Sequence, residues 1–169
     1  MKKLISTDMT ASNIQDVLQL LRETPAALKT LSRGLSSQQL NAPLGPGERS
    51  FTECLAHLLH CEALTSQAIF LALLIDEPLL ANIHPERDLG KLIRLDHMPF
   101  EELLDYFKFR RTILLRVLEP LTEKKWSRGV REEKKQRKES VFWKARGQAL
   151  HELEHLQDLE LKLTGKRSN

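Results

Sequence analysis

His151-Glu152-Leu153-Glu154-His155 lies in a C-terminal segment whose pattern predicts one long helix. Residues four apart lie one above the other on a helix face, so the two imidazoles can approach one divalent ion from the same side. Zinc-type catalytic sites usually need three protein ligands and one open position. The third ligand must therefore come from elsewhere in the chain, and the candidate is His57.

The composition is that of a globular protein. Of the 169 residues, 41% are hydrophobic and 29% are charged, which suits a single domain over residues 1–169. The longest apolar run, Ala68 to Ile75, has eight residues and is too short to span a bilayer. Lys2 and Lys3 are followed by no apolar segment of the kind that directs secretion. We therefore expect a cytoplasmic protein with no membrane association.

The two cysteines agree with this location. Cys54 and Cys61 are seven residues apart on one predicted helix. That spacing separates them by about 10 Å along the axis, which is beyond the reach of a disulfide. We expect reduced thiols that act as small core residues and not as ligands.

Four segments carry helical periodicity. The first covers residues 13–23 and then, at Thr24-Pro25, either kinks or restarts towards Gly34. The second follows a capping box, in which Ser50 is the N-cap and Glu53 is the third helical residue. The third begins with Pro99 in its first helical position, and the fourth follows an N-cap at Ser140. The last three helices are expected at about residues 51–75, 99–120 and 141–163.

The connections between these helices are less regular. Residues 41–47 are rich in helix breakers and predict a loop. Residues 76–98 are too long for a tight turn, so we expect a crossover along the bundle with a short helix near 89–95. Residues 123–138 carry eight basic and three acidic side chains, and 126–140 is long enough for a small hairpin. The interspersed glutamates and the lack of helix-turn-helix spacing favour a solvated loop over a nucleic-acid interface.

Four helices with apolar faces predict an all-α fold, a four-helix bundle with a long crossover between its second and third helices. His57 lies seven residues after its helix cap, and His151 and His155 lie eleven and fifteen after theirs. In an antiparallel pair, His57 and His155 then lie about 10 and 14 Å from the same end of the bundle. In a parallel pair, the depth of His57 differs from that of His151 by about 6 Å and from that of His155 by about 12 Å. The site therefore predicts antiparallel pairing of these two helices.

Two runs resemble the DinB/YfiT-like metal-binding bundles (DinB superfamily), namely Pro46-Gly47-Glu48-Arg49-Ser50-Phe51-Thr52-Glu53-Cys54-Leu55-Ala56-His57-Leu58 and His151-Glu152-Leu153-Glu154-His155-Leu156. The similarity extends over about residues 12–163. It implies that a divalent metal is bound by His57, His151 and His155, with Zn favoured and Ni, Fe or Mn as alternatives. Relatives of this type include thiol-dependent S-transferases and isomerases, so the resemblance also implies a low-molecular-weight thiol as a cosubstrate.

Two other metal sites use the same residues. The letters H-E-x-x-H are also those of zinc proteases, in which the glutamate, here Glu152, is the general base. However, only fourteen residues follow His155, and Asp158 occupies the place where one protease class has glycine. A di-iron site needs two Glu-x-x-His motifs, but Glu53 precedes His57 by four residues and not three. His60 is expected beside the site or at the surface, and His84 and His97 in loops.

We therefore expect a metal-dependent enzyme with a small-molecule substrate, a thiol S-transferase or a hydrolase. Three neutral imidazoles and an open position can lower the pKa of a bound water or thiol. The alternative is a bundle that binds metal or a partner without catalysis, and a homodimer remains open. Glu152 should face a neighbouring helix or solvent and not serve as the base. A mostly cationic rim is expected at one bundle end, from Glu48, Arg49, Lys162, Lys166 and Arg167, and it could attract an anionic thiol.

Overall fold

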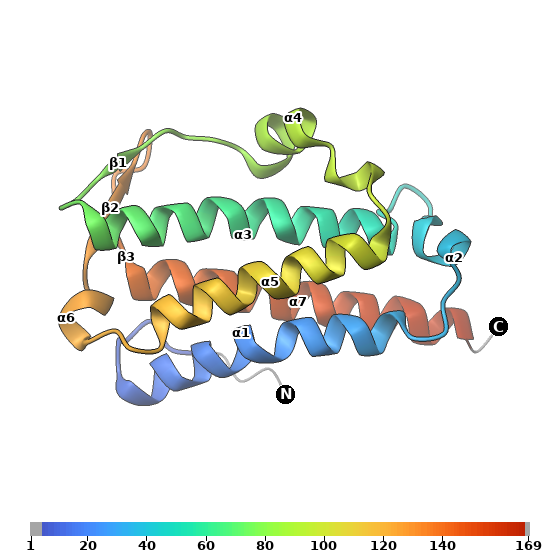
Figure 1. Cartoon of the computed structure of the whole chain (residues 1–169), viewed down its shortest axis with the longest axis horizontal. Coiled ribbons are helices and arrows are strands. Elements are labelled where there is room, and N and C mark those ends of the chain that lie inside the picture. Colours follow the sequence, from blue (N-terminus) through green and yellow to red (C-terminus); the bar gives the residue numbers. More distant parts are fainter. Residues whose placement is uncertain (1–4, 168–169) are drawn as a thin grey trace.

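Four long helices run side by side and form a bundle, as the sequence predicted (Figure 1). The computed structural model describes the backbone of residues 5–167 and the side chains of residues 5–165. The helices are α1 (Ala11–Ser32), α3 (Phe51–Leu74), α5 (Phe100–Leu118) and α7 (Val141–Arg167). Helices α1 and α3 each pack against both α5 and α7. Helix α3 runs antiparallel to α7 and parallel to α5, so a crossover must connect α3 to α5.

Helix α1 continues through Pro25, so the restart considered at Thr24-Pro25 does not occur. Proline has no N–H group and leaves the carbonyl four residues earlier without its helical donor. That carbonyl belongs to Leu21, and Arg111 of α5 donates to it from Nη1 at 2.6 Å. A side chain of a neighbouring helix thus replaces the missing backbone donor, and the helix remains continuous.

Helix α3 begins where the capping box predicted. The Ser50 hydroxyl accepts a hydrogen bond from the Glu53 backbone N–H at 3.1 Å, and the Glu53 carboxylate accepts one from the Ser50 N–H at 2.6 Å. A second capping box, of Ser36 and Gln39, begins the short helix α2 (Ser37–Asn41), which the sequence reading missed. These caps fix the start of α3 and therefore the depth of every side chain along it.

The crossover lies against α3 and is built from short pieces. It contains β1 (Leu79–Leu80), the π-helical turn η1 (Pro85–Gly90), α4 (Lys91–Ile93) and the 3-10 turn η2 (Leu95–His97). The His84 ring begins η1 by accepting hydrogen bonds from the N–H groups of Glu86 and Arg87. The short helix expected near 89–95 is therefore present, but it is broken into three turns. Arg94, with a left-handed φ of 55°, separates the last two.

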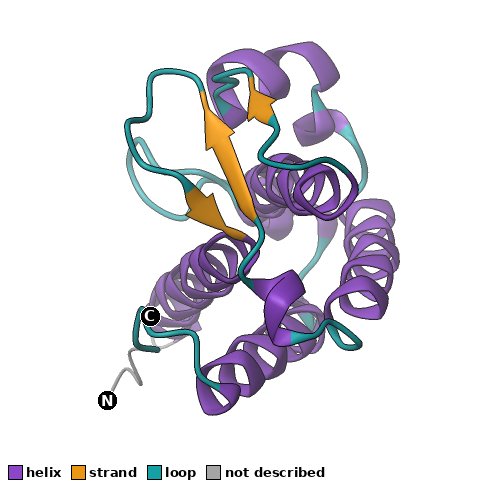
Figure 2. Ribbon diagram, turned by 90° about the vertical axis from the view of Figure 1, so that its left-hand side faces the viewer, coloured by secondary structure: helices purple, strands orange, loops and turns teal. Residues whose placement is uncertain are grey.

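The basic segment folds into α6 (Glu123–Trp126) and the hairpin of β2 (Gly129–Glu132) and β3 (Glu139–Ser140). Strand β1 pairs in parallel with β2, so a small three-stranded sheet in the order β1-β2-β3 joins the crossover to the hairpin (Figure 2). The hairpin lies within residues 126–140, where the sequence left room for one, and the fold is otherwise the expected helical bundle. The hairpin forms because Trp126 and Val130 are buried, while the charges of the segment face solvent or pair with carboxylates.

Two apolar clusters fill the bundle, one towards each end. The first includes Leu55, Leu104 and Leu159, and the second includes Ile69 and Leu114. Between them lie buried polar side chains: Thr24, His57, Glu62, Ser66, Arg111, Gln148 and Glu152. Buried polar groups require partners. The middle of the bundle is therefore a polar layer enclosed by two apolar cores, and the candidate site lies in it.

Helix α3 is long and apolar enough, with a mean hydropathy of 1.3 in its best window, to pass a length and composition test for a membrane span. Within that window 44% of the residues are buried inside the bundle. Its polar side chains include the buried His57, His60 and Glu62. These features are those of a core helix, which passes the same test.

Candidate metal centre

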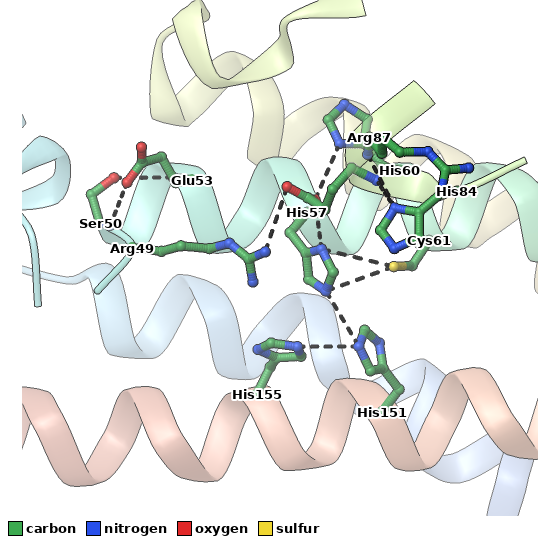
Figure 3. Close-up of polar contacts among 11 residues, drawn as sticks. Arg49, Ser50, Glu53, His57, His60, Cys61, His84, Arg87, His151 and His155 are labelled. Atoms are coloured by element: carbon green, nitrogen blue, oxygen red, sulfur yellow. Dashed lines mark hydrogen bonds and ion pairs between the residues drawn. The ribbon is translucent and has the colours of Figure 1, made fainter. Parts of the chain in front are cut away.

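Three imidazoles converge between α3 and α7 (Figure 3). Nε2 of His57 lies 3.3 Å from Nε2 of His151, which in turn lies 3.1 Å from Nε2 of His155. The ring centroids are 4.6 to 5.2 Å apart. The structure thus brings together all three residues that the sequence selected. His57 and His155 each present Nε2 to Nε2 of His151.

Local signals place these rings. The Ser50 and Glu53 capping box fixes the start of α3, and the Ser140 hydroxyl accepts from the Trp143 N–H at 3.1 Å at the start of α7. His151 and His155 are one turn apart on α7, so they share the face that meets α3. Because α3 and α7 run antiparallel (Figure 1), His57, seven residues after Ser50, meets His151, eleven residues after Ser140.

The three nitrogens fit a cation better than they fit one another. A neutral imidazole nitrogen carries either one proton or one lone pair in the ring plane. Nε2 of His151 contacts two other nitrogens, so it satisfies only one of them by hydrogen bonding. Zn–N bonds of about 2.0–2.1 Å at tetrahedral angles separate two ligand nitrogens by about 3.4 Å. The observed separations of 3.1 and 3.3 Å agree with ligation of one shared ion.

Glu86 of η1 orients the His57 ring. Oε1 of Glu86 lies 2.6 Å from Nδ1 of His57, and Oε2 of Glu86 lies 3.5 Å from Nη2 of Arg49. An ionised carboxylate only accepts, so the proton of His57 is on Nδ1 and its Nε2 lone pair faces the other two histidines. Carboxylates in this position fix the tautomer of metal-binding histidines. Glu86 was not predicted, because its contact with His57 spans 29 residues and no local pattern encodes it.

Burial sets the charge state of the cluster. Desolvation is the largest effect on all three histidines and lowers each pKa, that of His155 to about 4. The three rings are therefore neutral near pH 7, as metal ligation requires. Burial raises the pKa of Glu86, but the hydrogen bond from His57 and the positive charge of Arg49 outweigh burial and hold this pKa below its ordinary value.

Cys61 also lies at the cluster, which corrects the expectation that both cysteines are core residues. Its Sγ is 3.7 Å from Nε2 of His57, and His57, Cys61 and His151 can each offer one ligand atom within 4.8 Å of the others. Cys61 follows His57 by four residues, so both side chains lie on one face of α3. That spacing was the available signal. Cys54 is a buried core residue, as expected.

His60 is buried and lies beside the site. Both ring nitrogens lack a hydrogen-bond partner among the described residues, and Nδ1 is 3.7 Å from Oε1 of Glu86. The ring packs against the backbone of η1 at Gly90, where a Cβ atom would approach it to 3.2 Å. His60 therefore fills the space between α3 and the crossover and does not point at the three converging nitrogens.

Glu152 points away from the histidines. It is fully buried, and its carboxylate forms a two-point ion pair with Arg111 of α5 and accepts from Gln148 at 2.7 Å. This agrees with the expectation that Glu152 faces a neighbouring helix. A protease base must reach the water that the metal activates. The Glu152 carboxylate is instead bound by Arg111 and Gln148, which argues against a zinc-protease arrangement.

Small cavities adjoin the cluster on the side of the crossover and the hairpin. One, of about 270 Å³, is lined by Cys61, Thr65, Lys144, Gln148 and His151 among others. A more apolar cavity of about 280 Å³ shares Cys61, Thr65 and Lys144 with it. A third, of about 460 Å³, lies on the other side of His57 and is bordered by Arg49. A small molecule thus has room beside the converging nitrogens.

The expected cationic rim is largely neutralised within the described side chains. Arg49 pairs with Glu86, and Lys162 pairs with Glu48 at 3.0 Å and with Asp158 at 2.7 Å. The side chains of residues 166 and 167, which belong to the same prediction, lie outside the described residues. Arg49 is the rim residue that reaches the site.

The sequence of residues 20–159 matches the family model of the DinB superfamily. The chain belongs to the DinB superfamily. Among solved structures, this DinB superfamily protein resembles YfiT from Bacillus subtilis, described as a probable metal-dependent hydrolase with an unusual four-helix bundle topology. The TM-score is 0.84 with 16% identity, over 96% of this chain and 92% of YfiT. At that identity the likeness shows the fold. A comparison with curated proteins gives no match.

Proposed function

We propose that this DinB superfamily protein binds one divalent metal ion through Nε2 of His57, His151 and His155 and catalyses hydrolysis or thiol S-transfer on a small molecule. The observation that carries the proposal is the convergence of three Nε2 atoms at 3.1 and 3.3 Å. The carboxylate of Glu86, which directs the His57 lone pair towards the other two rings, supports it.

The residues of the chain have separable tasks in this proposal. His57, His151 and His155 hold the ion, and Glu86 keeps His57 in its ligating tautomer. Glu152 and Arg111 tie α7 to α5 next to the two α7 histidines. When bound, a divalent ion supplies Lewis-acid chemistry and lowers the pKa of a water or thiol that reaches it.

The cavities beside the cluster suggest how a substrate is oriented. Thr65 and Gln148 are hydrogen-bonded to each other at 3.0 Å and line the cavity next to His151. Both side chains can exchange this bond for one to a bound molecule. Lys144 borders the same cavity but is paired with Glu132 and Glu139, so it adds little net charge. The chain thus favours a small, mostly neutral substrate over a highly charged one.

The description of YfiT as a probable metal-dependent hydrolase supports hydrolysis as one of the two reactions. Cavities of about 270 and 280 Å³ support a small-molecule substrate or thiol. A bundle that binds metal without catalysis is the second candidate. The ion pair of Glu152 with Arg111 favours this second candidate, because the paired carboxylate cannot serve as a base.

A turnover screen separates these candidates. The metal-loaded protein is assayed with ester and amide substrates, and with small thiols plus electrophiles, beside the chelator-treated protein and the variants His155→Ala and Glu154→Gln. We expect turnover in the loaded protein and in Glu154→Gln, whose side chain is exposed, and its loss in His155→Ala. Equal turnover in His155→Ala contradicts the proposal, and no turnover in any metal-loaded sample supports the non-catalytic candidate.

A further inference from the structure

The thiol of Cys61 lies beside two of the three converging histidines, His57 and His151. Its Sγ is 3.7 Å from Nε2 of His57, the atom that also faces His151. Together, His57, Cys61 and His151 form a group that could hold a metal ion, with ligand atoms within 4.8 Å of one another. Cys61 is partly buried and carries a free thiol.

The distance agrees with shared ligation. Zn–S bonds of about 2.3 Å and Zn–N bonds of about 2.0–2.1 Å at a tetrahedral angle separate the sulfur and nitrogen by about 3.5 Å. The observed 3.7 Å is close to this value. Cys61 belongs to α3 one turn after His57, so both residues reach the same point without a change of backbone.

We propose that Cys61 is the fourth protein ligand of the metal ion, so that the resting site holds three imidazoles and one thiolate. This inference rests on the proposed function, because it takes the three histidines as the other ligands. When the sulfur–metal bond forms, the thiol proton leaves to solvent and no electron is transferred. Cys61 is a ligand that the sequence does not single out.

A fourth protein ligand changes what the site can do. Four protein ligands make a closed zinc site, whereas a catalytic site keeps one position open. A substrate must then displace Sγ of Cys61 or enter as a fifth ligand. Cys61 also lines two of the three cavities beside the cluster, so a molecule that enters either of these two meets this sulfur at the site. A thiolate ligand further favours zinc-like ions over magnesium or calcium.

Cobalt substitution tests this ligand directly, because a thiolate bound to Co²⁺ gives a charge-transfer band in the near ultraviolet that imidazole ligands do not give. The full-length protein is loaded with Co²⁺ and compared with Cys61→Ser and with Cys54→Ser. Cys54 lies on the same helix and is buried in the core, so it is the matched control. We expect the band in the wild type and in Cys54→Ser, and its complete loss in Cys61→Ser, which keeps about one cobalt per chain.

The outcomes separate this inference from the proposed function. Cobalt bound to the wild type without the band, or an unchanged band in Cys61→Ser, overturns Cys61 ligation and leaves the three-histidine site standing. No cobalt bound by the wild type overturns both. X-ray absorption of the zinc-loaded wild type requires no variant: a shell with one sulfur supports the inference, and a shell of nitrogen and oxygen alone overturns it.

Discussion

The ion pair of Glu152 and Arg111 offers a sharp test of how the bundle is held together next to the site. Both side chains are buried, with exposed fractions of 0 and 2%. Replacing one partner of such a pair costs about 3–5 kcal/mol, because the other charge is left buried and unpaired. Glu152→Gln keeps the size and one carbonyl oxygen, so we expect the lower value, about 3 kcal/mol.

That loss should be visible by thermal unfolding. For a chain of this length, 1 kcal/mol shifts Tm by about 2–4 °C, so Glu152→Gln should lower Tm by about 6–12 °C. The control Glu154→Gln changes an exposed side chain on the same helix and should stay within about 0.5 kcal/mol of the wild type. Metal content should be unchanged in both variants. A Tm of Glu152→Gln within 2 °C of the wild type, or a loss of its metal, would refute this role.

A rescue experiment distinguishes the two tasks of Arg111. Arg111→Met also removes the donor to the Leu21 carbonyl, which Pro25 leaves without its helical partner. In that background, Pro25→Ala restores a backbone N–H in the helix and should recover about 1–3 kcal/mol. Urea unfolding measures the recovery. If Pro25→Ala changes the free energy of unfolding equally in the wild type and in Arg111→Met, the link between the two residues is contradicted.

Two further predictions concern the histidines. Glu86→Gln should weaken metal affinity about 10–100-fold without abolishing binding, because the amide orients His57 less firmly; a competition titration with a coloured chelator measures this, and unchanged affinity would contradict it. In the metal-free protein, the lowered pKa of His57, His151 and His155 means that the unfolded chain binds more protons below about pH 6.5. The free energy of unfolding is therefore highest above that pH and falls as the pH drops towards 4, where His155 titrates in the folded chain. Urea unfolding of the chelator-treated, metal-free protein at a series of pH values checks this. A free energy of unfolding that stays constant from pH 7 to 4.5 would refute it.

Local signals were sufficient for the four long helices and for the histidine cluster. The Ser50 capping box fixed the start of α3, and the spacing of His151 and His155 fixed their common face. Both are interactions within one or two turns, which a linear pattern contains. The antiparallel pairing followed because His57 then reaches the same depth.

The remaining features depend on contacts between distant segments. Glu86 reaches His57 only when the crossover folds over α3, and Arg111 reaches Leu21 across 90 residues. The parallel pairing of β1 with β2 joins segments about fifty residues apart. None of these contacts has a periodic signature in the sequence. Cys61 is the exception, because its spacing of four residues from His57 places both side chains on one face of α3.

The central claim is that His57, His151 and His155 bind one metal ion together, and elemental analysis tests it most directly. The protein is purified without chelator, loaded with Zn²⁺ and desalted, beside His57→Ala, His151→Ala and His155→Ala. His97→Ala is the control, because His97 is exposed in the crossover. We predict about one metal ion per chain in the wild type and the control and its loss in the other three variants. Full metal content in His57→Ala, or none in the wild type, would contradict the claim.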